Sequence, residues 1–297
     1  MLDEMKSKLR VAGCQFAVAG DIEFNLRQIL AQIDEAAAAA AQVVQFPEAA
    51  LSGYAGVDIP DFSHLDWDAL RRATDEIRHA AALRKVWVLL GSAHRLSDAH
   101  RPHNSIYVIS DEGQIVDRYD KRFCTGTDGP QPEMDLKHYS PGDHATTFEV
   151  AGHRCGVLIC YDYRFPELYR DLKLRGVEIV FQSFHNARRD HQTFRHRNIW
   201  KQIVPATMMC HAATNHFWML AVNSSAKYSM WANFFVRPDG RIAGRLELHE
   251  TGVLVGDVDP ELKLWDASAP WRLRAMQGTL HSGELVDDPR SRDRISY

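Results

Sequence analysis

Long apolar runs are absent from this chain of 297 residues. Those present are too short to cross a bilayer, and the N-terminal segment MLDEMKSKLR lacks the apolar core of a signal peptide. A dominant charge is also absent, because 35 Lys and Arg oppose 39 Asp and Glu for a formal charge of −4. A charge of that size does not recruit nucleic acid or an anionic membrane. We therefore expect a complete cytoplasmic protein that binds neither of them.

Cysteine is scarce, and its spacing excludes two further classes of protein. The five cysteines are odd in number and include no CxxC pair, which argues against a disulfide framework and a structural zinc site. A reducing compartment fits this usage. His185, His191 and His196 lie near one another, but on different faces of any helix and without a carboxylate at ligand spacing. We expect a solvated or substrate-facing loop there, and no metal ion.

What remains is the composition of an ordinary globular protein, with 45% hydrophobic and 25% charged residues. No repeat or linker-like change of composition is visible, so we expect one domain over 1–297, with its core at about 9–258. Strand and helix patterns alternate at both ends, with hairpins between them. This order favours an α/β fold in which two mixed, helix-covered sheets pack face to face. We expect strands over 9–18, 43–46, 86–92, 103–110, 114–119, 146–150, 153–159, 177–184, 218–223, 229–236, 241–246 and 251–258, and helices over 21–41, 67–83, 166–175 and 199–214.

The stretch GVLICYDYRFPELYR, residues 156–170, places a cysteine between a strand and a helix. The apolar run 156–159 predicts a buried strand that stops at Cys160, while Pro166 and Glu167 mark a helix start. Ligands bind at this edge of open α/β sheets, and the positive end of a nearby helix favours a thiolate over a thiol. Cys160 is therefore the candidate nucleophile, although a lone cysteine at a strand end is more often a buried apolar side chain.

Two other polar side chains also follow predicted strands. Glu48 comes just after the strand at 43–46, where Pro47 ends the ladder and fixes the turn that presents the carboxylate. Lys121 follows the strand at 114–119. Taken singly, each is more often a solvated surface charge. Because Cys160 also follows a strand, all three side chains can converge on one edge of the sheets.

Cys, Glu and Lys together support acyl transfer. A Cys nucleophile needs a base, and a carboxylate held among apolar neighbours can take its proton. The attacked acyl carbon becomes tetrahedral and gains a negative oxygen. The ammonium of Lys121, together with the backbone N–H of Tyr161, could hold that oxyanion.

Three segments, FPEAALSGY, RYDKRF and LICYDYRFPELYR, resemble the signatures of the nitrilase superfamily, the carbon–nitrogen hydrolases with a Glu-Lys-Cys triad. They occur in the family's order and at family-like separations, and the resemblance covers roughly residues 9–258. It implies a four-layer α-β-β-α sandwich, hydrolysis of a non-peptide C–N bond through a thioester, no cofactor, and a homodimer or larger assembly. We expect the tail, 259–297, at an interface between subunits.

The resemblance also implies roles for individual residues. Glu48 matches the general base, Lys121 the oxyanion-stabilising lysine and Cys160 the nucleophile. The family tends to place a second Glu six residues before the Pro-Gly that precedes the nucleophile strand. This chain has Asp135 at that position, with Glu133 two residues earlier, so both remain candidates for a second acid.

The segment after the nucleophile, YDYRFPE, looks most like that of amidases acting on small linear ω-amides of dicarboxylic acids. True nitrilases usually carry Trp-Glu after the cysteine, and N-carbamoyl amino acid hydrolases usually carry Asn-Asp. The match to the family weakens at 211–215 and 231–233, which leaves the substrate open. An N-carbamoyl hydrolase is the alternative enzyme, a nitrilase is less favoured, and an inactive scaffold that binds a partner is the alternative outside catalysis.

Residues that could contact a small amide substrate are harder to assign. Arg164 could bind a substrate carboxylate bidentately, or it could pair internally with Glu167 or another acid. Phe184, at the end of a predicted strand, and Arg188, in the loop beyond it, are further candidates for substrate contact.

Overall fold

The computed structural model describes residues 6–186 and 199–296. The first of its two six-stranded sheets has the order β12-β1-β2-β3-β4-β5. Neighbours among β1, β2 and β3 are parallel, whereas β12, β4 and β5 run antiparallel to their neighbours. The strands are β1 (Leu9–Gln15), β2 (Val43–Gln45), β3 (Trp87–His94), β4 (His103–Ile109), β5 (Ile115–Asp120) and β12 (Gly252–Val258).

The second sheet repeats this plan, with the order β11-β10-β9-β8-β7-β6. Here β7, β8 and β9 form the parallel centre, and β6, β10 and β11 are antiparallel to their neighbours. Within each sheet, the central strands are parallel to one another. Their carboxyl ends therefore lie together at one edge of the molecule. The strands are β6 (Thr147–Val150), β7 (His153–Ile159), β8 (Ile179–Ser183), β9 (Trp218–Val222), β10 (Phe234–Val236) and β11 (Ile242–Arg245).

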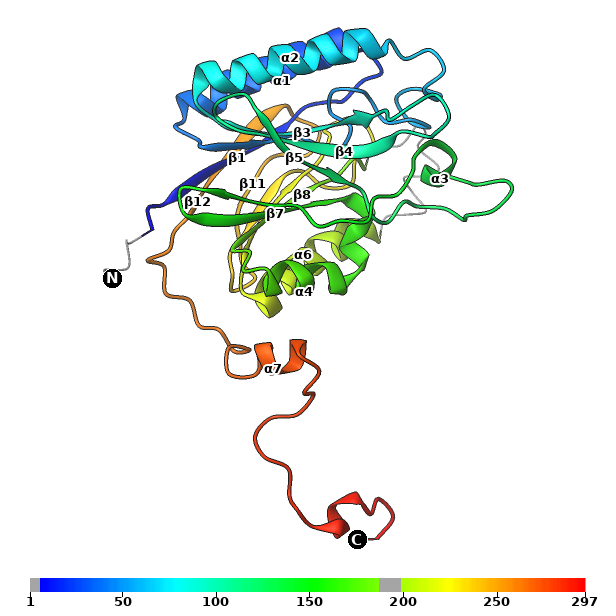
Figure 1. Ribbon diagram of the computed structural model, residues 1–297. Helices are drawn as coiled ribbons and strands as arrows, with labels where there is room; N and C mark the ends of the chain where they lie inside the picture. Colours follow the sequence, from blue (N-terminus) through cyan, green and yellow to red (C-terminus); the bar gives the residue numbers. More distant parts are fainter. Residues whose placement is uncertain (1–5, 187–198, 297) are drawn as a thin grey trace.

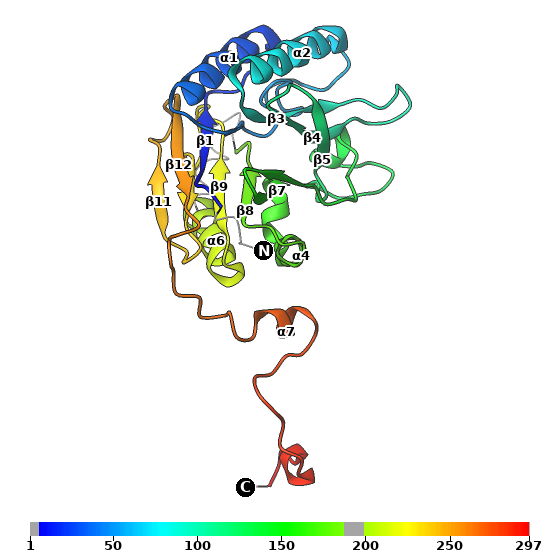
Figure 2. The same cartoon turned by 60° about the vertical axis from the view of Figure 1, so that its left-hand side comes forward.

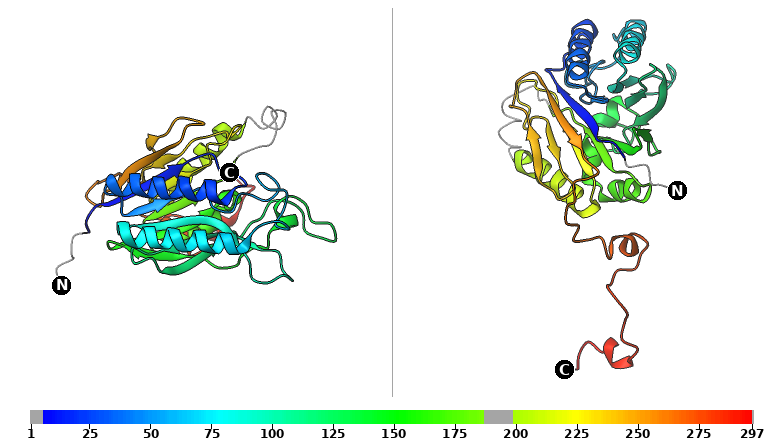
Figure 3. Two further views of the ribbon diagram at one scale, coloured as in Figure 1. Left: turned by 90° about the horizontal axis from the view of Figure 1, so that it is seen from above. Right: turned by 90° about the vertical axis from the view of Figure 1, so that its left-hand side faces the viewer.

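Helices cover the outer face of each sheet, which confirms the predicted four-layer α-β-β-α sandwich (Figures 1 and 2). The helices α1 (Ile22–Ala38) and α2 (Trp67–Arg84) lie side by side over the first sheet (Figure 3). The helices α4 (Pro166–Leu174) and α6 (Trp200–Asn215) cover the second. Asp21 begins α1, because its carboxylate accepts a hydrogen bond from the N–H of Phe24 at 3.0 Å.

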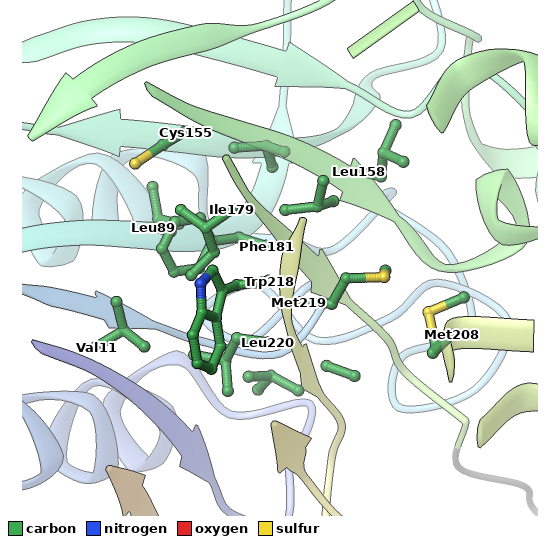
Figure 4. Packing of buried hydrophobic residues seen from close by; sticks show 14 of the residues in the cluster. Val11, Leu89, Cys155, Leu158, Ile179, Phe181, Met208, Trp218, Met219 and Leu220 are labelled. Atoms are coloured by element: carbon green, nitrogen blue, oxygen red, sulfur yellow. The ribbon is translucent and has the colours of Figure 1, made fainter. Parts of the chain in front are cut away.

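Two large clusters of buried apolar side chains hold the sandwich together. Between the sheets, Val11 and Leu89 of the first sheet belong to the same buried cluster as Phe181 and Leu220 of the second (Figure 4). The other cluster lies between the first sheet and its two helices, where Ile29 on the apolar face of α1 is fully buried. Burial of such apolar surface is the main force that sets the two sheets against each other.

The structure differs from the predicted elements at several places. Ala40 adopts a positive φ of 60°, so α1 ends at Ala38 rather than at 41. The strand predicted over 229–236 begins only at Phe234. Asn233 makes side-chain hydrogen bonds there instead, accepting from the N–H of Asn223 at 2.7 Å. Between the strands predicted to end at 119 and to begin at 146, where no helix was expected, the chain forms a short helix, α3 (Asp135–His138).

The C-terminal tail leaves the sandwich after β12 (Figures 1 and 2). It contains α7 (Arg272–Met276) and a short turn, η2 (Pro289–Arg292). The guanidinium of Arg272 connects α7 to the end of α6 by donating to the carbonyl oxygen of Thr214 at 2.9 Å. Leu280 and Ile295 farther along are 84% and 93% exposed, so the tail presents apolar side chains to solvent. No helix in the described residues is long and apolar enough to cross a membrane.

Candidate active site

Glu48 lies fully buried in the turn after β2, with hydrogen-bond donors on both carboxylate oxygens. Oε1 accepts from Nζ of Lys121 and from Nδ2 of Asn104, both at 2.8 Å. Oε2 accepts from the backbone N–H of His185 at 2.9 Å. These contacts come from both sheets, so the position of the carboxylate depends on how the sheets are joined.

Lys121 directly follows β5 and is also fully buried. Its ammonium donates to Glu48 at 2.8 Å, to Oδ2 of Asp135 at 2.8 Å and to the hydroxyl of Tyr54 at 3.3 Å. Burial disfavours the charge, but the carboxylates of Asp135 and Glu48 outweigh this effect and raise the pKa of Lys121 well above its ordinary value. Lys121 is therefore a permanent cation at the centre of the site.

Cys160 follows β7 and begins the short helix η1 (Cys160–Arg164). Burial raises the pKa of its thiol, and the negative charge of Glu48 raises it further, while the positive charge of Lys121 opposes both effects. The resting group is a thiol. The sequence predicted that a helix start favours a thiolate, but desolvation and two nearby carboxylates, Glu48 and Asp135, outweigh the opposing charge of Lys121 and favour the thiol. The sulfur therefore needs a base before it can attack.

The two candidates for a second acid occupy different environments. Asp135 is buried at the start of α3, where it accepts from Lys121 at 2.8 Å, from the hydroxyl of Tyr54 at 2.6 Å and from the N–H of Thr125 at 3.0 Å. Despite burial, these partners lower the pKa of Asp135, so it is a carboxylate. Glu133 is exposed at the surface. The structure therefore brings Asp135, and not Glu133, to Lys121.

The carboxylate of Asp162 connects the turn at Cys160 to the segment around Lys121. It accepts from the N–H of Ile159 at 3.0 Å, from the N–H of Phe123 at 2.9 Å and from the hydroxyl of Tyr119 at 2.8 Å. Tyr119 and Phe123 flank Lys121 in the sequence, and Ile159 precedes Cys160. Burial raises the pKa of Asp162 to about 6, against the effect of these donors. Sequence reasoning quoted this residue only as part of a motif.

A cavity of about 740 Å³ opens at these side chains. Tyr161, Arg164 and Phe184, which the sequence indicated as candidates, line this cavity. The guanidinium of Arg164 stacks on the Trp200 ring at 4.3 Å. It makes no ion pair with Glu167 or any other acid among the described residues, so the internal pairing considered from the sequence is not found. Arg188 lies outside the described residues, and so do His191 and His196.

Sequence reasoning missed the buried pair formed by His185 and Asp58. Nε2 of His185 lies 2.8 Å from Oδ2 of Asp58, and the imidazole side chain is fully buried rather than solvated. The ring stacks on Tyr54 at 4.9 Å between centroids. Pairing of residues so far apart in the chain has no local signal in the sequence. Within residues 6–186 and 199–296, no group of three or more His, Cys, Asp and Glu side chains could hold a metal ion.

The three motifs thus lie at one cavity, which Tyr54, Lys121 and Cys160 line, and the ammonium of Lys121 binds the carboxylate of Glu48 there. The family model of the carbon–nitrogen hydrolases matches residues 10–266. The chain belongs to the carbon–nitrogen hydrolase family. The match confirms the resemblance to the nitrilase superfamily that the motifs around Glu48, Lys121 and Cys160 indicated.

Curated relatives of this family member include nitrilase homolog 2 of Dictyostelium discoideum, 25% identical over 57% of this chain and 51% of that protein. An omega-amidase of Homo sapiens is 27% identical over 59% of this chain and 62% of its own length. The chain thus spans only about half to three fifths of these two relatives. Such names agree with the branch suggested by the motif after Cys160.

Solved structures with the same fold include an amidase from Nesterenkonia sp.. Its TM-score is 0.70 at 21% identity, and the match covers 87% of this chain and 93% of that one. A variant of that amidase carries the acetamide moiety of fluoroacetamide covalently added at its active-site cysteine. At this level of identity the match establishes the sandwich fold of the chain.

Proposed function

We propose that this chain hydrolyses a small linear amide to a carboxylic acid and ammonia, with Cys160 as the nucleophile. The observation that supports the proposal is the contact of the buried Glu48 carboxylate with the ammonium of Lys121 at 2.8 Å, together with the cavity that Lys121 and Cys160 both line. A thiol, a base and a permanent cation are the groups that acyl transfer requires.

In the first half of the reaction, Glu48 takes the proton of the Cys160 thiol, and the sulfur attacks the amide carbon. The electron pair of the carbonyl moves to its oxygen, which Lys121 and the N–H of Tyr161 stabilise. The contact of Lys121 with the Tyr54 hydroxyl, at 3.3 Å, is its longest and the easiest for an oxyanion to replace. Collapse of the tetrahedral intermediate breaks the C–N bond, and the nitrogen leaves as ammonia with the proton from Glu48.

In the second half, Glu48 removes a proton from water as the water oxygen attacks the thioester. The C–S bond breaks, the carboxylic acid leaves, and the sulfur regains its proton. Asp135 remains ionised beside Lys121 throughout, and we assign it the role of the second acid that keeps the ammonium charged and oriented.

The favoured substrates are small ω-amides of dicarboxylic acids. The YDYRFPE motif and the names of the relatives support this choice, together with Arg164, which lines the cavity and has no carboxylate partner among the described residues. A guanidinium of this kind can bind the distal carboxylate of such a substrate. Phe184 supplies an apolar wall for the acyl chain.

Replacement of the nucleophile tests the proposal directly. We expect Cys160→Ala to lower ammonia release by about four orders of magnitude or more and to leave the circular dichroism spectrum unchanged. Cys210→Ala, an exposed cysteine on α6, is the matched control and should keep its activity. Ammonia release by Cys160→Ala at the rate of the parent chain would refute the proposal.

A substrate panel separates the related enzymes. It should contain ω-amides, unsubstituted aliphatic amides, N-carbamoyl amino acids and nitriles, with ammonia and carbon dioxide measured together. Carbon dioxide released alongside ammonia would identify an N-carbamoyl hydrolase instead. Failure of a thiol-directed acylating probe to label Cys160 would favour the inactive scaffold.

We further infer a homodimer or larger homo-oligomer in which the tail, 259–297, contacts a second copy. Its exposed apolar side chains, such as Leu280 and Ile295, support this arrangement. A cytoplasmic location is inferred from the cysteines, all five of which are free, as is usual in a reducing compartment.

A further inference from the structure

We propose that the buried pair of His185 and Asp58 is a positioning pair for Glu48, which fixes the second carboxylate oxygen and places a positive charge near the base. The proposal rests on the function proposed for Glu48. It adds two residues to which the three sequence motifs assign no role, and of the two His185 lines the cavity. Three connections join the pair to the reacting groups.

The first connection is a backbone hydrogen bond. The N–H of His185 donates to Oε2 of Glu48 at 2.9 Å, so any movement of His185 moves the base. The same turn is fixed from the other side, because the N–H of Glu48 donates to the carbonyl oxygen of Phe184 at 3.2 Å. Residues 184 and 185 thus hold Glu48 at both its backbone and its carboxylate.

The second connection runs through Tyr54. Oδ2 of Asp58 accepts the backbone N–H of Tyr54 at 2.9 Å and lies 2.8 Å from Nε2 of His185. The imidazole stacks on the Tyr54 ring, whose hydroxyl contacts both Lys121 and Asp135. Asp58 therefore sets the place of the imidazole and of the tyrosine that contacts the ammonium.

The third connection is charge. Among the described residues, the charged or titratable groups at this buried site include the carboxyl groups of Glu48, Asp58, Asp135 and Asp162 and the ammonium of Lys121. Burial disfavours the imidazolium, but Asp58 and then Glu48 outweigh it and raise the pKa of His185. A cationic His185 offsets part of this excess of negative charge. A carboxylate that loses such a neighbouring cation is protonated more readily.

The test measures the reactivity of Cys160 without relying on turnover. Iodoacetamide alkylates a thiolate, and base assistance by Glu48 is lost when that carboxylate is protonated. The rate of Cys160 alkylation is followed by peptide mass spectrometry as a function of pH in the parent chain, in His185→Gln and in Asp58→Asn. His185→Gln keeps the backbone N–H that binds Glu48 and removes only the charge.

We expect the acidic limb of the alkylation profile to move to higher pH in both variants, so that the rate near pH 6 falls by about tenfold while the rate at alkaline pH changes less. His153→Gln is the matched control, because His153 is a buried histidine paired with Glu178 at 3.0 Å and lies outside the cavity. Its acidic limb should coincide with that of the parent chain.

A uniformly lower rate with an unmoved limb in both variants would show a merely structural role and overturn the proposal. A shift of equal size in the His153→Gln control would also overturn it. If His185→Gln does not fold, Asp58→Asn decides, because its amide keeps the shape of the side chain. Should the parent chain hydrolyse no amide, the proposed function fails, whereas the alkylation profile still tests the pair.

Discussion

Cys160 has a backbone conformation that side-chain-bearing residues rarely adopt, with a φ of 41°. Such a turn persists when its surroundings determine it, and Asp162 supplies three hydrogen bonds that do so. The same carboxylate binds the segments on both sides of Lys121. At the scale of single residues, Asp162 therefore sets the distance between the sulfur and the ammonium.

Asp162→Asn should lower the rate of amide hydrolysis by about tenfold or more, because the new NH₂ group must face a donor at Ile159, Phe123 or Tyr119. Steady-state kinetics on the best ω-amide measures the effect. Asp143→Asn, whose side chain is 101% exposed, is the control and should behave like the parent chain. Equal activity of the two variants would contradict this role.

The same substitution predicts a change in how stability depends on pH. Burial raises the pKa of Asp162 from 3.8 to about 6, so its proton stabilises the folded chain at low pH. That stabilisation, about 3 kcal/mol, is lost as the pH rises from below about 4 to above about 6. The difference in free energy of unfolding between the parent chain and Asp162→Asn should shrink by this amount over that range. Urea unfolding at several pH values measures it, and a constant difference would refute it.

Single residues show where sequence reasoning reached its limit. The convergence of Glu48, Lys121 and Cys160 was predictable, because each residue lies in a distinct motif just after a strand. The protonation state of Cys160 was not, since it depends on burial and on Glu48 and Asp135, which lie far away in the sequence. The pairing of His185 with Asp58 depends likewise on tertiary contact.

At the scale of elements, β3 shapes the turn that presents Glu48. A Cβ atom at Gly91 would lie 2.1 Å from the carbonyl oxygen of Pro47 and 2.9 Å from the nitrogen of Ala49. Both are backbone atoms that cannot rotate away. The carbonyl oxygen of Gly91 also accepts from the N–H of Leu51 at 3.0 Å, which holds the turn against the strand. A side chain at this position must therefore displace the base.

Gly91→Ala should lower the free energy of unfolding by about 1–3 kcal/mol and reduce amide hydrolysis more than this loss of stability explains. Gly252→Ala is the matched control, since its Cβ would meet only side-chain atoms of Leu246, at 3.7 Å and 3.8 Å. Urea unfolding and ammonia release under fully folded conditions measure the two effects. Full activity in Gly91→Ala would show that the turn tolerates the displacement.

Most elements were predictable because their patterns are strong. The helix at Trp67–Arg84 and the strand at His153–Ile159 follow clear periodicities and end within a residue or two of the predicted bounds. The short helix α3 was missed because its stability comes from contacts of Asp135 with Lys121 and Tyr54, not from its own sequence. The shortened strand before Phe234 reflects side-chain hydrogen bonds of Asn233 that no pattern reveals.

At the scale of the whole molecule, the C-terminal tail is the part of the chain that lies outside the sandwich. Its section after α7 exposes Leu280, Leu285, Val286 and Ile295 by 72% or more. An exposed series of apolar side chains is typical of an interface. The part up to α7 remains attached to α6 through Arg272.

Removal of residues 277–297 should convert an oligomer to monomers and leave the sandwich folded, because Arg272 and the body are retained. Size-exclusion chromatography with light scattering measures the mass, and circular dichroism checks the fold. Replacement of Leu285 and Val286 by serine should weaken the assembly in the same direction. An unchanged mass after truncation, or a parent chain that is already monomeric, would contradict the proposed interface.

Glu48 and Lys121 follow strands of one sheet, whereas Cys160 and His185 follow strands of the other. Neither sheet carries all of the proposed reacting groups. One provides the carboxylate and the ammonium, and the other provides the sulfur. If one sheet slides against the other, the nucleophile moves away from the base while each sheet stays intact. The proposed reaction consequently depends on the apolar contacts between the two sheets as much as on the groups that exchange protons.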